Sequence, residues 1–571
     1  MKNIQVYRHS SSLWQKFLNL NPQLFREIKG KLKTKNVIIA AAISVITQFV
    51  VGISLLSNLP TLDPQGLLGV QSGRYGMGVG YRAAYTKDMF GDWIINWQLL
   101  WLDLFMTLSI IAIFSLLIIG TYMLIADTAK EESRGTLNFI RLTPQSATTI
   151  LLGKILGVPI LLYIAVLLML PLQVVAGLGA HVPLVLIIGF NAVILASCAF
   201  YYSFALVWSS LDLGLSGLKP WLGAGVVGFL LTILTNVTMH DNHVINHAIW
   251  DWIVLFNPGI VLAYLIDATY LSLNKIDFLS AQNFGELLFY GQALWTKASF
   301  GIAFILFNFS LWTYWCWSVL TRRFHNPHNT LLSKSQSYWI TGWLSVFALG
   351  FTLQDSSTYL WQADGFVFLQ FCLCTLGLIL IAALSPHRQK LYDWARYRHQ
   401  VHHNGNVLWK ELIFGENSPS GVAVAINMAI AITYITPSIF LFLQHNRQYI
   451  FWGFVLSGFS VLLYGLVAQL ILTLKTHRRG IWSAIGVISM IIVPPVCLSF
   501  ANVYPSSTPQ PWLWGFLPTA ATEYATISTI LLAILGQVVA ISAIAWQTTK
   551  VLKQAGKSET KTLLETSKIS S

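Results

Sequence analysis

Three histidines and an aspartate lie close together in the segment Met-His-Asp-Asn-His-Val-Ile-Asn-His, near the middle of the chain. His243 and His247 are four residues apart, so on a helix they face the same side and can share a zinc ion with His240 or Asp241. No HExxH motif accompanies them. A polar loop at the outer membrane surface explains the same residues, and the sequence leaves both interpretations open.

Outside this cluster, the polar residues do not form a recognisable catalytic site. No P-loop of the form GxxxxGK[ST] occurs, and no polar stretch is long enough for an ATPase domain. The loops offer no Ser/His/Asp set and no pair of carboxylates suited to acid–base chemistry. Asp103 stands inside an apolar run, where an acid either faces the bundle interior or lies near the interface. We therefore predict no catalytic residue, no resident metal and no cofactor.

The composition is typical of a membrane protein. Of the 571 residues, 55% are hydrophobic and 10% are charged, whereas charged residues make up about a quarter of a soluble domain. The net charge of +13 does not indicate nucleic-acid binding, because the basic residues gather near the ends of apolar runs. The five cysteines fall within predicted spans and lack CxxC spacing, so we interpret them as small apolar residues.

Apolar runs of about 20 residues, each long enough to cross a bilayer as a helix, recur along the whole chain. The sequence predicts an all-α, polytopic membrane protein with twelve transmembrane helices. The predicted spans are 37–59, 99–125, 150–175, 182–209, 221–237, 298–320, 338–354, 364–384, 421–443, 449–474, 481–503 and 524–547. With both termini in the cytoplasm, 29 of the 35 Lys and Arg residues lie on the cytoplasmic side, as the positive-inside rule requires.

A charged stretch follows the second predicted span and leads into the third. Its charged residues are Asp127, Lys130, Glu131, Glu132 and Arg134. Together they make a polar face that is too costly to leave in hydrocarbon, so we expect this stretch in the cytoplasm.

A short helix lying crosswise on the membrane surface is predicted next. Gly135 interrupts the preceding helix, and Thr136 is the predicted N-cap of the new one. Leu137 and Ile140 then lie on one side of that helix. Thr143-Pro144 is a second start signal, an N-cap with proline at the first helical position, after which the chain returns to the membrane.

Residues 1–36 are basic and amphipathic. Asn21 and Pro22 supply the N-cap and first turn of a predicted helix. One face of this helix is apolar and basic residues surround it, which is the pattern of a helix in the headgroup region. The apolar face is Leu24, Phe25, Ile28 and Leu32. The chain shows no secretory cleavage signal here, so we expect the first span to stay uncleaved.

Several of these features together resemble the ABC-2 type permeases, the membrane subunits of a class of ABC exporters. Glu132-Ser133-Arg134-Gly135-Thr136, followed by Leu142-Thr143-Pro144 and Leu152-Gly153-Lys154, is similar to the cytosolic stretch that follows the second span in that family. The segment 252–290 is similar in place and length to the family's re-entrant helical pair. The Asn-Pro-x-x-x-Arg-Glu pattern of the family's elbow helix is matched by Asn21, Pro22, Arg26 and Glu27.

The resemblance implies a coupling helix at 130–142 that is moved by a separate ABC ATPase subunit, which binds ATP. The residues it assigns to ATPase coupling are Glu131, Glu132, Arg134, Gly135, Thr136, Leu137, Ile140, Thr143 and Pro144. It further implies export of a substrate across a bacterial cytoplasmic (inner) membrane, in contact with membrane lipids and with no nucleic acid partner. Whether a second permease chain completes the transporter stays open.

The predicted organisation is a cytoplasmic elbow region, a six-span permease domain, a second six-span region and a disordered cytoplasmic tail, at 1–36, 37–325, 326–548 and 549–571. The second half has no counterpart of Arg134-Gly135-Thr136, although residues 408–412 echo residues 24–28. Two alternatives remain: a polytopic enzyme acting on lipid at the outer face, with a metal at His240, His243 and His247, and a membrane scaffold that does not transport.

Overall fold

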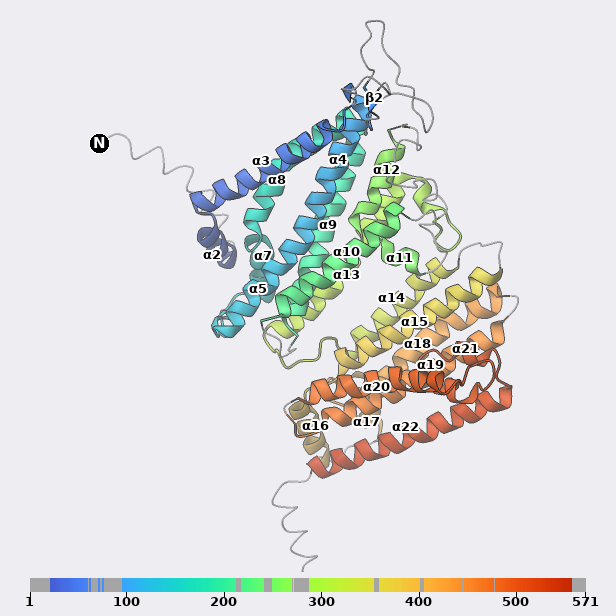
Figure 1. Ribbon diagram of the computed structural model, residues 1–571. Coiled ribbons are helices and arrows are strands. Elements are labelled where there is room, and N and C mark those ends of the chain that lie inside the picture. The colour runs from blue at the N-terminus through green and yellow to red at the C-terminus, as the bar shows by residue number, and fades with distance from the viewer. Residues whose placement is uncertain are drawn as a thin grey trace, which may run out of the picture. The chain divides into compact units, whose positions relative to one another are not determined.

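The computed structural model divides the chain into two compact units (Figure 1). It describes residues 21–59, 61–62, 70–71, 74–75, 95–211, 217–240, 249–269, 271, 287–353, 359–400, 405–443, 446–476 and 478–556. The first unit contains residues 1–245, 253–287 and 294–325, and the second contains 246–252, 288–293 and 326–571. Each unit is considered by itself below.

The described part of the first unit is helical apart from one short antiparallel ladder, in which Thr61 pairs with Gln71 and Leu62 with Val70. Its elements are α2 (Pro22–Lys31), α3 (Thr34–Leu56), β1 (Thr61–Leu62), β2 (Val70–Gln71), α4 (Trp97–Phe114), η1 (Ser115–Ile119), α5 (Gly120–Ser133), α6 (Thr136–Arg141), α7 (Ala147–Gly157), α8 (Ile160–Gly179), α9 (Leu184–Ser209), α10 (Lys219–His240), η2 (Pro258–Val261), α12 (Leu262–Asp267), η5 (Leu294–Thr296) and α13 (Ala298–Phe324). The short helix α11 (Trp250–Val254) is shared between the two units.

The second unit is built from helices that pack around α19 (Arg447–Leu472). This central helix contacts its neighbours along most of its length, and Leu456, Val461 and Tyr464 on it are buried. The other elements are α14 (Lys334–Thr352), α15 (Tyr359–Leu384), α16 (Arg388–Gln400), α17 (Gly405–Phe414), α18 (Gly421–Phe442), α20 (Arg479–Phe500), η6 (Gln510–Trp514), α21 (Thr519–Thr522) and α22 (Ile527–Gly556). The predicted disorder of the tail is wrong for residues 549–556, because α22 continues through them.

The chain is a multi-pass membrane protein. In the part that the structure describes, ten helices are long and apolar enough to cross a membrane. They are Thr34–Leu56, Trp97–Ser133, Ile160–Gly179, Leu184–Ser209, Ala298–Phe324, Ala363–Leu384, Gly421–Phe442, Arg447–Leu472, Arg479–Phe500 and Ile527–Ala555. Helices α10 and α14 lie where the other two spans are predicted. In α14 the polar residues Lys334, Ser335 and Gln336 fill the first turn and lower its hydropathy, whereas in α10 the structure describes the side chains only as far as Asn236.

The third predicted span, 150–175, is wrong as a single element. The structure has two helices there, α7 and α8, which meet at Val158 and Pro159. Proline removes an amide donor and clashes with the preceding turn, which kinks or breaks a helix, and at Pro159 the helix breaks. Helix α8 is the apolar span, whereas α7 packs against the N-terminal helix α2 (Figure 1).

The second predicted span is part of a much longer helix. Residues Trp97–Ser133 form one span candidate of 37 residues, built from α4, the π-helical segment η1 and α5. A helix of this length measures about 55 Å, against about 30 Å for the hydrocarbon core of a bilayer. Its last turns, which begin near Asp127, therefore extend beyond the apolar layer.

The π-helical segment coincides with a close helix contact. The Tyr202 hydroxyl of α9 donates a hydrogen bond of 2.9 Å to the Leu116 carbonyl oxygen, which lies within η1. A side chain at Gly120 would collide with the Tyr202 ring and hydroxyl, so the absence of a Cβ there permits the approach. The Leu116 carbonyl oxygen also accepts from the Gly120 amide, so the Tyr202 hydroxyl uses its second lone pair.

Candidate functional site at the elbow and coupling helices

The elbow helix α2 is anchored at its first residue. As predicted, the Asn21 side chain caps the helix by accepting a hydrogen bond of 3.1 Å from the Leu24 amide, and Pro22 occupies the first helical position. The same Asn21 side chain donates through Nδ2 to the Thr149 carbonyl oxygen of α7, at 2.7 Å. The cap therefore also joins α2 to α7.

Two glycines of α7 allow α2 to lie directly on it. Gly153 and Gly157 are four residues apart, on one face of the helix. A Cβ at Gly153 would be 2.8 Å from the Asn21 Oδ1 and the Leu24 amide nitrogen, and a Cβ at Gly157 would be 2.5 Å from the Glu27 Cβ. Small residues at this spacing are the usual means by which two helices approach closely in membranes.

Lys154, between these glycines, is the centre of a buried ion-pair network. Its side chain is 1% exposed, and its Nζ lies 2.9 Å from the Asp127 Oδ2 and 2.5 Å from the Glu131 Oε2, both on α5. An ammonium group removed from water needs such partners, because an unpaired buried charge is strongly destabilising. Lys154 therefore fixes α7 to the cytoplasmic end of the long helix.

The elbow helix completes the network with three charged side chains. Arg26 pairs with both Glu27 and Glu131, while Lys31 lies 3.1 Å from the Glu27 carboxylate and 4.0 Å from that of Asp127. Burial lowers the pKa of the Arg26 guanidinium, but its hydrogen bonds and attraction to Glu27 and Glu131 outweigh this effect, so the pKa is raised. The six groups carry three positive and three negative charges, so the network is balanced.

The three carboxylates of this network are close enough to hold a metal ion. Oxygens of Glu27, Asp127 and Glu131 lie within 4.8 Å of one another. The Lys154 ammonium already contacts two of them, and it supplies the positive charge that a bound cation would otherwise provide. We interpret the cluster as a structural latch between α2, α5 and α7, and we call it the Lys154 latch.

The break between α5 and α6 occurs at Gly135, which adopts the left-handed conformation with φ of 71°. The predicted N-cap at Thr136 is wrong. Gly135 is the capping residue and provides no side chain, while Thr136 is already helical and its hydroxyl donates to the Glu131 carbonyl oxygen at 3.1 Å. The left-handed glycine turns the chain so sharply that the threonine falls inside the new helix, where its hydroxyl bonds back to α5.

The second predicted start signal is also displaced. Helix α7 begins at Ala147 with Ser146 as its N-cap, not at Thr143-Pro144. The Thr143 hydroxyl instead donates to the Ile140 carbonyl oxygen at 2.7 Å, where the Thr143 amide also donates, at the end of α6. Thr143 and Pro144 are both exposed and belong to the connection between α6 and α7.

Helix α6 has a buried side and an exposed apolar side. Leu137 and Ile140 are 5% and 9% exposed, on the side that the sequence indicated. Phe139, which no sequence pattern singled out, is 75% exposed, and Leu142, quoted above only as part of a family motif, is 83% exposed. Large apolar side chains this exposed, on a segment expected outside the bilayer, are typical of a surface that contacts another protein.

The C-terminal end of α6 is attached to the last span of the first unit. The ring of His325 lies 3.3 Å from the Arg141 carbonyl oxygen. A narrow cavity of about 40 Å³ separates α6 from the ends of α9 and α13, and Arg141, Glu132 and Arg323 are among its lining residues. Burial lowers the pKa of the Arg141 guanidinium, and the negative charge of Glu132 opposes that shift.

The structure brings some predicted coupling residues together and leaves others apart. Glu131 joins Arg26 and Glu27 of the elbow in the latch. Glu132 and Arg134 are exposed at the end of α5 and make no ion pair with residues that the structure describes. Sequence reasoning missed the role of Lys154, although the Gly153-Lys154-x-x-Gly157 pattern was available as a signal for close helix packing.

Two other predicted features lie elsewhere. Asp103 is bound by Arg74, whose Nε and Nη2 lie 2.6 and 3.1 Å from its two oxygens, and it accepts a hydrogen bond of 3.0 Å from the Tyr75 hydroxyl. Paired in this way, Asp103 anchors the loop before α4. His240 lies at the end of α10 without a described side chain, and His243 and His247 lie outside the described residues.

Searches against known proteins returned no match. No protein-family model matches the chain, and neither a curated protein nor a solved structure resembles it significantly. The resemblance to ABC-2 permeases therefore depends on the motifs described above and on the geometry around them.

Proposed function

We propose that the chain is the membrane-spanning permease subunit of an ABC-2 type exporter, which moves a substrate across the cytoplasmic membrane. ATP hydrolysis in a separate ATPase subunit drives the transport. The observation that carries this proposal is the exposed pair Phe139 and Leu142 on α6, a short helix at the tip of a long span. The fit of the elbow and coupling motifs to one another supports it.

The contacts of α6 suit a helix that transmits a displacement to the rest of the bundle. Short connections tie it to α5 and α7, and its buried residues Leu137 and Ile140 hold it to the bundle. The Lys154 latch joins α5 and α7 to the elbow helix, and the Arg141–His325 contact joins α6 to α13. A displacement of α6 is therefore transmitted to several helices together rather than absorbed by a loose loop.

In this proposal the ATPase binds the Phe139 and Leu142 surface, and its closure on ATP moves α6 relative to the membrane. The helices tied to α6 then repack between inward-open and outward-open arrangements. Coupling of this kind requires only that the ATPase interact differently with the two arrangements. The exposed charges Glu132 and Arg134, next to α6, are available to set the orientation of the docked subunit.

The test is affinity purification of the tagged full-length chain from native membranes, followed by mass spectrometry and measurement of ATP hydrolysis. The wild-type chain is expected to bring down a P-loop ATPase whose activity depends on the chain. The double variant Phe139→Ser/Leu142→Ser should lose the ATPase without losing its fold, because both side chains are exposed. A matched control is Trp409→Ser, which removes an apolar residue of α17 that is 60% exposed.

Two results would refute the proposal. One is purification of the wild-type chain with no nucleotide-hydrolysing protein, which would favour a non-transporting scaffold. The other is equal retention of the ATPase by the wild-type chain, the double variant and the Trp409→Ser control, which would mean that α6 is not the docking element.

A further inference from the structure

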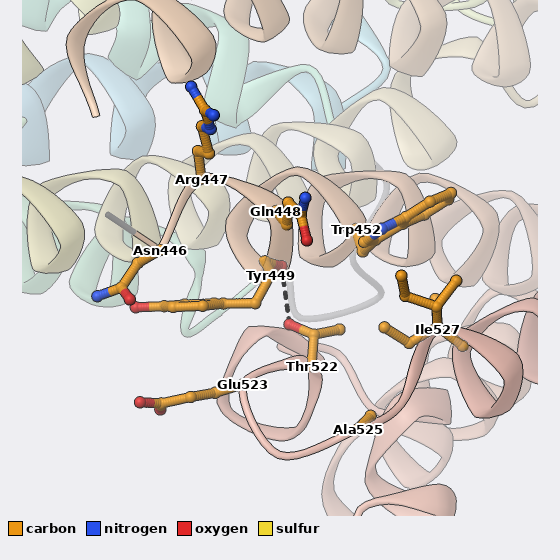
Figure 2. Close-up of a pocket in the computed structure, with 10 residues that line it drawn as sticks. Asn446, Arg447, Gln448, Tyr449, Trp452, Thr522, Glu523, Ala525 and Ile527 are labelled. Carbon is orange, nitrogen blue, oxygen red and sulfur yellow. Dashed lines mark hydrogen bonds between the residues drawn. The ribbon is translucent and has the colours of Figure 1, made fainter. Parts of the chain in front are cut away.

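The second unit contains a groove at one end of its helix bundle, where the start of α19 faces the connection between α21 and α22 (Figure 2). Its volume is about 400 Å³. The lining residues are Asn446, Arg447, Gln448, Tyr449, Trp452, Thr522, Glu523, Ala525, Ile527 and Ile530. A hydrogen bond of 2.8 Å from the Thr522 hydroxyl to the Tyr449 carbonyl oxygen joins the two walls.

The rim of the groove carries opposite charges that do not neutralise each other. Arg447 and Glu523 are both exposed, and neither forms an ion pair with the residues that the structure describes. Figure 2 shows the Glu523 carboxylate beside the Tyr449 ring, while Arg447 extends away from the floor of the groove. The amide side chains of Asn446 and Gln448 stand on the same rim and are exposed.

The floor of the groove is apolar and continuous with the core of the unit. Ile530 is 2% exposed and belongs to a buried cluster with Leu456 and Leu513. Trp452 and Ala525 are partly buried and pack against this same cluster. A ligand in the groove therefore meets a firm apolar surface below and charged or amide groups above.

An exposed apolar track leads out of the groove along α22. Ile527 lines the groove, and Leu531 and Leu535 follow it at intervals of four residues, so the three share one face of the helix. They are 57%, 46% and 61% exposed. Because α22 is a span candidate, this track lies against lipid chains in the membrane.

We propose that the groove binds a zwitterionic phospholipid with a primary ammonium group. The ammonium binds the Glu523 carboxylate and the amide oxygens of the rim. The exposed Arg447 side chain turns toward the groove to bind the phosphate, and one acyl chain follows Ile527 and the track on α22. The separated charges match a headgroup that carries both signs, and the track favours a lipid over a small polar zwitterion. A headgroup without an ammonium would supply no cationic partner for Glu523.

The ends of the helices place this site in one leaflet. The groove lies where α19 and α22 begin, whereas the opposite end of the unit carries Lys475, Arg478 and Lys553. The positive-inside rule assigns that basic end to the cytoplasm, so the groove belongs to the outer leaflet. The inference concerns the second unit alone and does not depend on the ATPase-driven function proposed for the chain.

The probe is phosphatidylethanolamine with a photoactivatable group on its acyl chain, incorporated in nanodiscs with the full-length chain. After illumination, labelled peptides are identified by mass spectrometry. Labelling is expected on α22 peptides that contain Ile527, Leu531 or Leu535, and unlabelled phosphatidylethanolamine should compete. The same photoactivatable group should label these peptides about tenfold less on phosphatidylglycerol, which lacks the ammonium, and about a hundredfold less on diacylglycerol, which lacks both the ammonium and the phosphate.

Variants give the decisive comparison. Glu523→Gln and Arg447→Gln should each reduce the labelling by about tenfold for the same reason. Both residues are exposed, so thermal unfolding of the variants should stay unchanged, and Arg478→Gln at the other end of the unit is the matched control. Equal labelling by all three lipids, equal labelling of the variants and the control, or no labelling near Ile527 would each overturn the proposal.

Discussion

Replacing Lys154 with methionine is the sharpest test of the latch. Methionine keeps much of the length and apolar character of the lysine stem but removes the charge. The Lys154 ammonium is 1% exposed and contacts Asp127 and Glu131 at 2.9 and 2.5 Å. Without it, three clustered carboxylates face only Arg26 and Lys31, and Arg26 is 48% exposed and therefore screened by water.

The expected loss is about 3–5 kcal/mol of unfolding free energy, the usual cost of removing one partner from a buried ion pair. Chemical denaturation of the purified chain in mixed micelles measures it. Lys130→Met is the control, because Lys130 is exposed on the same stretch of α5 and its loss should change the unfolding free energy by less than about 0.5 kcal/mol.

A double variant separates charge imbalance from lost packing. Lys154→Met combined with Glu131→Gln restores equal numbers of positive and negative groups in the latch. If the imbalance is the main cost, the double variant should recover at least half of the stability lost in Lys154→Met, since neutral replacements of buried ion pairs are well tolerated. The reasoning is refuted if Lys154→Met is as stable as Lys130→Met, or if the double variant is no more stable than Lys154→Met.

Three further substitutions test other contacts. Gly157→Val should push the elbow helix off α7, costing about 1–3 kcal/mol and speeding tryptic cleavage of α2, and unchanged cleavage would contradict this. Gly120→Ala should cost a similar amount because its methyl group meets the Tyr202 ring, and unfolding should show partial relief when Tyr202→Phe is added. Burial and the adjacent Arg479 lower the pKa of His387 in the folded chain. As the pH falls through about 6.5, His387 therefore takes up a proton in the unfolded chain before it does so in the folded chain, and the free energy of unfolding decreases. His387→Asn should flatten this pH dependence of stability between about pH 7 and 5, as measured by denaturation.

Structural features that depend on a few neighbouring residues could be predicted from the sequence. Asn21 and Pro22 cap and start α2 because an asparagine side chain and a proline ring act on their own turn. The burial of Leu137 and Ile140 follows from their three-residue spacing on a helix. Most of the spans were likewise located from apolar runs, because a run of about 20 apolar residues is long enough to cross the bilayer as a helix.

Contacts between segments far apart in the chain could not be predicted from local sequence patterns. The residues of α7 do not indicate that Lys154 will contact Asp127, which belongs to another helix. A lysine in an apolar run is equally well explained by an exposed position near a helix end. The hydropathy of α7 and α8 is similar, so a window of span length merged them across Pro159. Thr136 was misassigned because capping and early helical positions differ only in the backbone turn that Gly135 provides.

Only the first half of the sequence contains the proposed docking motif for an ATPase subunit, and this bears on the number of permease chains in the proposed transporter. Glu411 of α17, in the segment that echoes the elbow helix, binds Trp394 and Arg398 of α16, which packs back on α22 through Leu391. The second half of the sequence has no counterpart of the Arg134-Gly135-Thr136 break that creates α6. In the proposed function, one chain therefore provides one docking helix. A transporter with two membrane domains would then contain two copies of this chain or one copy beside a different permease.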